Sequence, residues 1–131
     1  MKSIFASIVT TLVLLMAVTA NAASGVCTLD LSKLRFEETS IGKRIIGEPL
    51  ETKTISVQIP ADAGPYDYFN LTGTIGEFEI FAMVEPGEQR VSNIIVSDRT
   101  HMIELTNDQN LVSLSNMQSM QRVTVYCKYE Q

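Results

Sequence analysis

Apolar and polar residues alternate along most of the chain after residue 22, which is the pattern of half-buried β-strands. The segment Cys27 to Leu31 alternates in this way at the start, and the segment Arg122 to Tyr129 does so near the end. In both segments the cysteine lies on the apolar face. The sequence therefore predicts an opening and a closing strand whose cysteines face the core.

Further strands are expected between these two. The segments with strand character are Thr54–Ile59, Tyr66–Thr72, Glu77–Val84, Arg90–Val96, Met102–Thr106 and Leu111–Leu114. The segments with turn chemistry are Pro60–Pro65, Gly73–Gly76, Pro86–Gly87 and Asn107–Asn110. Short strands separated by regular turns predict an all-β fold, namely a small antiparallel β-sandwich of immunoglobulin-like type or a small barrel.

Two segments do not fit this pattern. Glu37 to Leu50 contains Gly42, Gly47 and Pro49, so we expect a long connection, with a short strand at its centre as the alternative. Ser115 to Gln121 is polar apart from two methionines whose spacing suits one turn of helix.

Residues 1–22 have the three parts of an export signal. Lys2 supplies a positive start, Ile4 to Val18 is largely apolar, and Ala20 to Ala22 resembles a cleavage site. We therefore expect a signal peptide at 1–22 and a single β domain at 23–131. A membrane anchor is one alternative. A lipoprotein with a lipid on Cys27 is another, although Val26 occupies a place where a small residue is expected.

The two cysteines, Cys27 and Cys127, are expected to form one disulfide in an oxidising compartment. The predicted bridge joins the first and last strands through the core, with the sulfurs facing each other across buried space. Two free buried thiols or an intermolecular bridge are the alternatives. The expected location is the periplasm, the cell surface or the medium of a bacterium.

Charge narrows the choice of partner. Without Lys2, 9 Lys and Arg stand against 15 Asp and Glu, a formal net charge of −6. This balance disfavours nucleic acid, which needs a basic stripe, and a partner guided by charge would be basic. After residue 22 no segment reaches the roughly 18 consecutive apolar residues of a membrane span, so no stable membrane insertion is expected after cleavage.

Catalysis has little support among the residues. His101 is the single histidine, both cysteines are assigned to the bridge, and no catalytic or nucleotide-binding motif occurs. Glu77 and Glu79 could act as a carboxylate pair, but we expect both on a solvated strand face. The sequence predicts neither an enzyme nor a cofactor.

A copper carrier is a further hypothesis. Thioethers bind Cu(I), and Met117 with Met120, together with His101 and Met102, would supply a ligand set. Filling gaps in the core is the ordinary role of methionine and is the competing interpretation.

The remaining function is a non-enzymatic interaction or structural protein whose partner is another extracytoplasmic protein. In size, signal and strand pattern the chain resembles bacterial fimbrial subunits, which are exported, disulfide-bridged, immunoglobulin-like proteins. That resemblance implies a fimbria-associated role.

The chain departs from the fimbrial pattern in three respects. Only Ala23 to Val26 precede the first cysteine, the predicted bridge closes a long loop, and Glu130 stands where the family has its next-to-last tyrosine. An accessory subunit is therefore favoured over a strand-donating one. The alternative is an acidic inhibitor of a basic secreted hydrolase such as a lysozyme.

Overall fold

The computed structural model describes residues 23–105 and 110–131, with the side chains of 103–105 excepted. The predicted export signal and most of the Asn107–Asn110 turn lie outside these residues. The elements, in order, are β1 (Ala23–Thr39), β2 (Gly42–Ile59), β3 (Phe69–Ile75), β4 (Phe78–Glu85), the 3₁₀ turn η1 (Pro86–Glu88), β5 (Arg90–Ser97), β6 (Met102–Leu105), β7 (Leu111–Asn116) and β8 (Gln121–Glu130).

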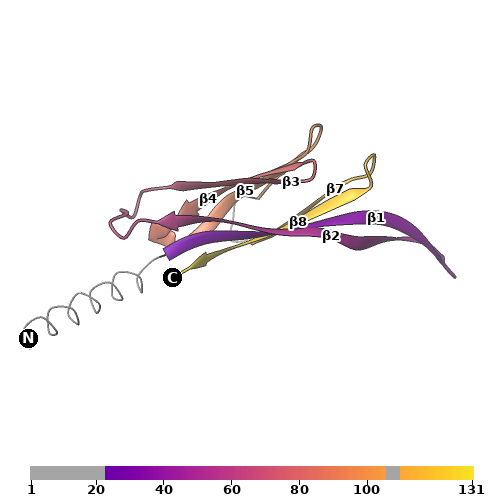
Figure 1. The fold of residues 1–131 in the computed structure, drawn as a ribbon, viewed down its shortest axis with the longest axis horizontal. Coiled ribbons are helices and arrows are strands. Elements are labelled where there is room, and N and C mark those ends of the chain that lie inside the picture. Colours follow the sequence, from indigo (N-terminus) through magenta and orange to yellow (C-terminus); the bar gives the residue numbers. More distant parts are fainter. Residues whose placement is uncertain (1–22, 106–109) are drawn as a thin grey trace, which may run out of the picture.

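The strands form two antiparallel four-stranded sheets that pack face to face (Figure 1). Sheet A has the order β2-β1-β8-β7, and sheet B has the order β3-β4-β5-β6. The alternating apolar residues of both sheets form one buried core, in which Leu29, Phe78 and Val125 are among the fully buried side chains. The all-β sandwich prediction is confirmed, and the barrel alternative is not.

The part of the chain that the structure describes contains no helix with the length and apolar character needed to cross a membrane.

Cys27 and Cys127 form the predicted disulfide between the first and last strands. They are direct partners in the β1–β8 register, with Cα atoms 4.1 Å apart, and both are fully buried. The bridge thus links neighbouring strands of sheet A. The predicted geometry, with sulfurs meeting across the core, is wrong because β1 and β8 lie side by side in one sheet.

The segment from Glu37 to Leu50 is not a long connection. β1 continues to Thr39, a tight turn follows, and β2 returns antiparallel from Gly42, whose φ of 140° favours glycine. Pro49 is tolerated because β2 is an edge strand and the register is irregular beside it. The alternative of one short strand at the centre of this segment is also wrong, because the segment contains the end of β1, a turn and the start of β2.

The predicted helical turn at Ser115–Gln121 is also wrong. β7 runs to Asn116, and residues 117–120 form a turn before β8. The Asn116 side-chain oxygen accepts hydrogen bonds from the backbone N–H groups of Gln118 and Ser119 at 2.9 and 3.3 Å. This asparagine turns the chain because its side chain replaces a backbone acceptor.

The turn predicted at Gly73–Gly76 is shorter than expected. Gly73 lies inside β3, and the turn consists of Gly76 and Glu77. This strand position holds a glycine because a side chain there would collide with Ile55 of β2.

Candidate functional site

The β1–β2 hairpin extends beyond the rest of the sandwich. Lys33 is the last residue of β1 in register with β8, and the Leu34 N–H still donates to the Met120 carbonyl of the β7–β8 turn at 2.7 Å. From Arg35 onward β1 pairs with β2 alone. We call residues 34–47 the arm; it projects from the end of the molecule opposite the C-terminus (Figure 1). At a rise of about 3.4 Å per residue, the arm reaches roughly 20 Å.

One face of the arm is occupied by ion pairs. Arg35 Nε donates to Glu48 Oε1 at 2.6 Å, and Arg44 donates to Glu37 Oε2 at 3.1 Å. These four residues lie on one side of the ribbon, because Glu37 and Arg44 are partners in register and Arg35 and Glu48 stand an even number of residues from them along β1 and β2. The charged side chains of the arm on this face are therefore all paired, Arg44 with Glu37 inside the arm and Arg35 with the flanking Glu48.

The opposite face, which we call the open face, carries apolar side chains in solvent. Phe36 and Ile45 are partners in register and remain 54% and 43% exposed. The next pair toward the tip is Glu38 and Lys43, and neither has an ion-pair partner within residues 23–105 and 110–131. At the tip, Ile41 is 97% exposed.

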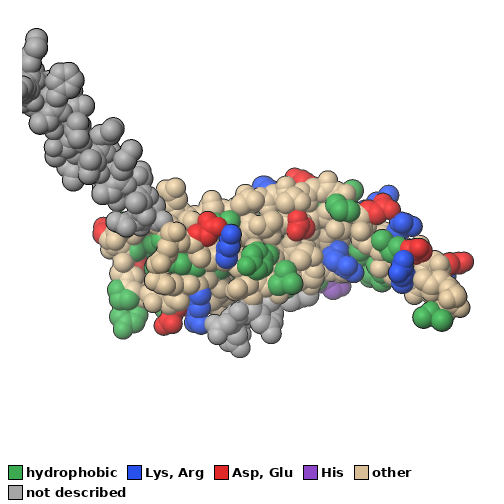
Figure 2. All heavy atoms as spheres, turned by 90° about the horizontal axis from the view of Figure 1, so that it is seen from below, with side chains coloured by type: hydrophobic (Ala, Val, Ile, Leu, Met, Phe, Trp, Pro, Cys, Tyr) green, Lys and Arg blue, Asp and Glu red, His purple; other side chains and the backbone are tan. Residues whose placement is uncertain are grey.

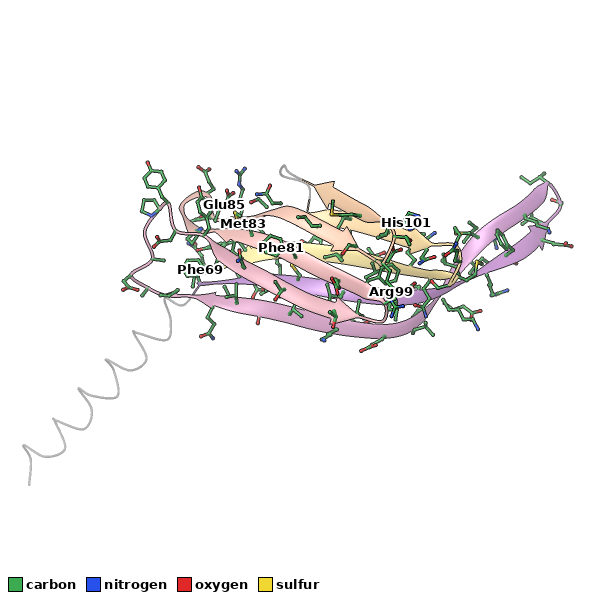
Figure 3. The ribbon with its side chains drawn as sticks, turned by 90° about the horizontal axis from the view of Figure 1, so that it is seen from above. Phe69, Phe81, Met83, Glu85, Arg99 and His101 are labelled. Atoms are coloured by element: carbon green, nitrogen blue, oxygen red, sulfur yellow. A yellow bond between two sulfur atoms is a disulfide. The ribbon has the colours of Figure 1, made fainter. Side chains whose placement is uncertain are left out.

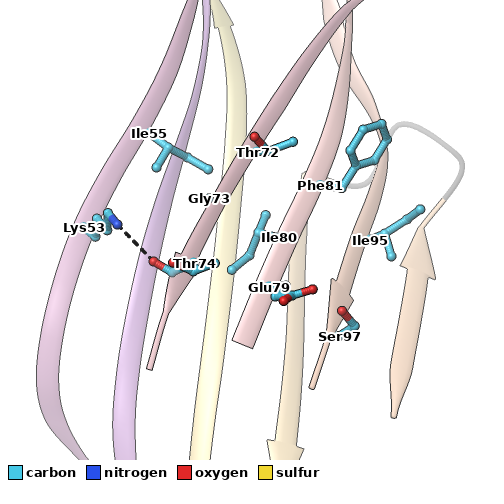
Figure 4. A pocket seen from close by; sticks show the side chains of 10 residues that line it. All are labelled: Lys53, Ile55, Thr72, Gly73, Thr74, Glu79, Ile80, Phe81, Ile95 and Ser97. Carbon is cyan, nitrogen blue, oxygen red and sulfur yellow. Dashed lines mark hydrogen bonds between the residues drawn. The ribbon is translucent and has the colours of Figure 1, made fainter. Parts of the chain in front are cut away.

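A second surface of interest is a shallow pocket of about 460 Å³ on the outer face of sheet B (Figure 4). It lies next to β2, the edge strand of sheet A. Cross-strand pairing arranges its lining in two rows. One row consists of Thr72 with the hydrophobic Phe81 and Ile95, and the other, the polar row, consists of Thr74, Glu79 and Ser97. We call this the sheet B pocket.

Strand β2 completes the side wall of the sheet B pocket. Ile55 lies against Gly73, where a Cβ atom would come within 2.9 Å of two Ile55 carbons. Lys53 Nζ donates a hydrogen bond to the Thr74 carbonyl at 3.1 Å. Ile55 and Lys53 therefore close the β2 side of the pocket (Figure 4).

The two glutamates that sequence analysis placed together on a solvated strand face have different surroundings. Glu79 is exposed, whereas Glu77 is half-buried in the β3–β4 turn. The Glu77 carboxylate accepts hydrogen bonds from Asn116 Nδ2 at 3.4 Å and from the Ser119 hydroxyl. The expectation for Glu77 is wrong, because this residue ties the β3–β4 turn of sheet B to the β7–β8 turn of sheet A.

His101 lies in the β5–β6 turn at the arm end of the sandwich (Figure 3). Its backbone N–H donates to Asp98 Oδ1 at 2.6 Å, and its Nδ1 lies 3.3 Å from Asp98 Oδ2. The Asp98 side chain is fully buried, and its pKa is lowered mainly by the backbone N–H of Thr100, with further contributions from His101 and an opposing effect of burial. These contacts stabilise the turn.

The four residues of the copper hypothesis are divided between two turns and the start of strand β6. Met117 and Met120 belong to the β7–β8 turn, while His101 precedes Met102 at the start of β6. Met102 and Met117 are exposed. Among the described residues, no group of three or more His, Cys, Asp or Glu side chains could hold a metal ion.

Comparison with protein-family models, with curated proteins and with solved structures gave no match.

Sequence analysis missed both surfaces. The arm could have been found from the alternation on each side of Gly42, in which Phe36 and Ile45 occupy equivalent positions of a hairpin. The sequence contained a weaker signal for the sheet B pocket, namely a large apolar residue, Phe81, on the polar side of its predicted strand. In the structure Phe81 is only half-buried, and Met83 and Glu85 lie on the same outer face (Figure 3).

Proposed function

We propose that this protein is an exported, non-enzymatic β-sandwich that binds another extracytoplasmic protein through the open face of its arm. The observation that carries the proposal is the exposed pair Phe36 and Ile45 on a projecting ribbon. An isolated two-stranded ribbon is marginally stable in water, and apolar side chains clustered on one face favour burial against a partner.

The composition of the arm also suits a binding element. Figure 2 shows hydrophobic side chains among acidic and basic ones along the projecting end. Aromatic and aliphatic residues surrounded by charges resemble the anchors and polar rim of protein interfaces.

The disulfide is consistent with an oxidising, extracytoplasmic compartment. Within that compartment we propose the periplasm or the cell surface, and an accessory role in a surface assembly such as a fimbria. Binding through a projecting arm needs no reactive side chain, as expected for a structural subunit.

A basic partner is the second candidate, and the distribution of charge favours it. The arm and its flanking Glu48 contain three basic and three acidic residues, so the net charge of −6 in residues 23–131 belongs to the sandwich. A basic hydrolase bound to the sandwich would lose affinity steeply with added salt. Binding unaffected by salt would contradict this candidate.

Capture of partners from the native envelope tests the first proposal. Affinity-tagged chain should retain a defined partner, and Phe36→Ser or Ile45→Ser should abolish retention. Tyr66→Ser is the matched control, because Tyr66 is an 85% exposed aromatic residue outside the arm. Equal capture by the arm variants and the control would overturn the proposal.

A further inference from the structure

We propose that the partner of the arm is the arm of a second copy of this chain. The two open faces pack against each other around a two-fold axis that runs along the arms, so that both tips lie at the same end of the dimer. This inference rests on the proposed function, because it names the partner of the same surface. It follows from the side of the sandwich on which the open face lies and from the order of its apolar and charged residues.

The open face lies on the solvent side of sheet A. Along β1, alternation places Phe36 on the face of Asp30, which is exposed, and opposite to the face of Leu31, which is buried in the core. Sheet B packs on that core face, so it does not cover the open face. The next residue of the open face toward the sandwich, Leu34, is buried. The exposed apolar surface therefore begins at Phe36 and continues toward the tip.

Face-to-face packing of two identical ribbons around an axis along their length follows one rule. The rotation exchanges the two strands, so each residue meets the residue that is its cross-strand partner within one arm. Phe36 of one copy thus meets Ile45 of the other, and Glu38 meets Lys43. Each of these contacts occurs twice, because the interface is isologous. Apolar side chains face apolar ones, and opposite charges face each other.

The two charges are available for this contact. Neither Glu38 nor Lys43 has an ion-pair partner in the part of the chain that the structure describes. On the other face of the arm, the carboxylate of Glu37 already binds Arg44. The open face therefore has unpaired charges to offer a second copy, whereas the ion-paired face does not.

An antiparallel arrangement of the two arms lacks this complementarity. With the apolar rows superposed, the charged side chains would lie over Leu34 and Gly47 of the other copy. With the arms shifted by one row, they would lie over Phe36 and Ile45. With the charged rows superposed, Glu38 would meet the same residue of the other copy. The order of residues on the arm therefore favours the parallel arrangement.

The contact between the arms is small. The arm is about 20 Å long and two strands wide, so the dimer should bury less than about 1,200 Å², which is the size of weak and transient interfaces. We therefore expect a reversible dimer that forms at high local concentration, as in a surface assembly.

Charge reversal tests the pairing. Sedimentation equilibrium of the disulfide-bonded chain, residues 23–131, should show a monomer–dimer equilibrium in a concentration series that reaches about 1 mM. Glu38→Lys and Lys43→Glu should each weaken dimerisation by about tenfold, since each places two pairs of like charges across the interface. Both residues are exposed, so the variants should fold; far-ultraviolet circular dichroism checks this.

An equimolar mixture of the two variants provides the decisive comparison. In each single variant, like charges also stand opposite one another within the same arm. The mixture keeps that repulsion within each arm but restores opposite charges between the arms, so it should recover the wild-type dimer affinity. Such recovery can come only from contact between the two open faces. The double variant Glu38→Lys with Lys43→Glu should also recover.

Glu37→Lys and Arg44→Glu are matched controls. They make the same changes in net charge at neighbouring positions of the arm, but on the ion-paired face. Each should change the dimer affinity by less than about twofold, because the distance and the salt screen these charges from the interface. Failure of the mixture to recover, or an equal effect of the controls, would overturn the inference.

The inference and the proposed function can fail separately. A chain that stays monomeric at every concentration, while Phe36→Ser still abolishes capture of an envelope protein, would overturn self-association and leave the arm as a binding element for a different protein. A monomeric chain whose capture is indifferent to Phe36→Ser would overturn both.

Discussion

Gly25 of β1 lies directly against Val84 of β4, so that a Cβ atom on Gly25 would overlap Cγ2 of Val84. The two residues belong to different sheets, and both are buried in the core. Gly25 thus allows the start of sheet A to approach sheet B closely. The contact lies two residues from the disulfide, because Cys27 is the next residue after Gly25 on the same face of β1.

Gly25→Ala should destabilise the protein by about 1–3 kcal/mol, because a well-packed core resists an added methyl group. Chemical denaturation of the disulfide-bonded chain measures this. Gly47→Ala is the control, since a Cβ there would be 3.4 Å from Ser32, an ordinary contact. Equal effects of the two substitutions would contradict the close packing of the sheets at Gly25.

Replacing both Cys27 and Cys127 with alanine should lower the free energy of unfolding by about 2–5 kcal/mol. The bridge spans a sequence separation of 100 residues, so it restricts the unfolded chain strongly. Denaturation of the double variant should match that of the reduced wild-type chain. A loss of stability below about 1 kcal/mol would show that β1 and β8 need no covalent link.

Glu77→Ala should cost about 1 kcal/mol, since it removes the acceptor of Asn116 and Ser119 that joins the two turns. Glu79→Ala should change stability by less than about 0.5 kcal/mol, because Glu79 is exposed. Thermal and chemical denaturation of the two variants should separate them. Similar values for both would refute the difference in their surroundings.

Protonation of Asp98 should contribute to the fall in the free energy of unfolding at low pH. Its pKa is lowered on folding by hydrogen bonds, the largest from the backbone N–H of Thr100, so the unfolded chain binds the proton more readily. This contribution is therefore complete above the unfolded pKa of about 3.9 and is lost as the pH falls through the folded value.

Comparison of two variants separates charge from geometry at Asp98. Asp98→Asn keeps an oxygen acceptor for the N–H groups of Thr100 and His101, and Asp98→Ala removes it. The stability difference between wild type and Asp98→Asn should shrink below about pH 4, as followed by urea denaturation across pH. Asp98→Ala should stay less stable than Asp98→Asn at every pH. A constant difference between wild type and Asp98→Asn would exclude the proton linkage.

The arm should contribute little to global stability. Phe36→Ser removes one cross-strand pair on an exposed ribbon, so the free energy of unfolding should change by less than about 1 kcal/mol. Unfolding by urea checks this before any binding experiment. A larger loss would mean that the open face supports the sandwich itself.

Much of the candidate site could not be predicted, although its residues are ordinary strand residues. Glu37 to Leu50 contains two glycines and a proline, which are breakers in a typical strand. They are tolerated here because β2 is an edge strand with an irregular register. Similarly, Gly73 resembles a turn residue, yet it pairs with Ile80 inside β3, where glycine is needed because Ile55 occupies the space of a side chain.

The alternation of apolar and polar residues by itself predicted a small all-β fold, either a sandwich or a barrel, and placed Cys27 and Cys127 on buried faces. Only the tertiary structure decided that these cysteines are neighbours in one sheet, that the first hairpin projects as an arm, and that Glu77 joins the two sheets. The physical reason is that alternation is a local property of one strand. Which strands pair depends on backbone hydrogen bonds and on packing between distant residues, and neither is encoded in a local pattern.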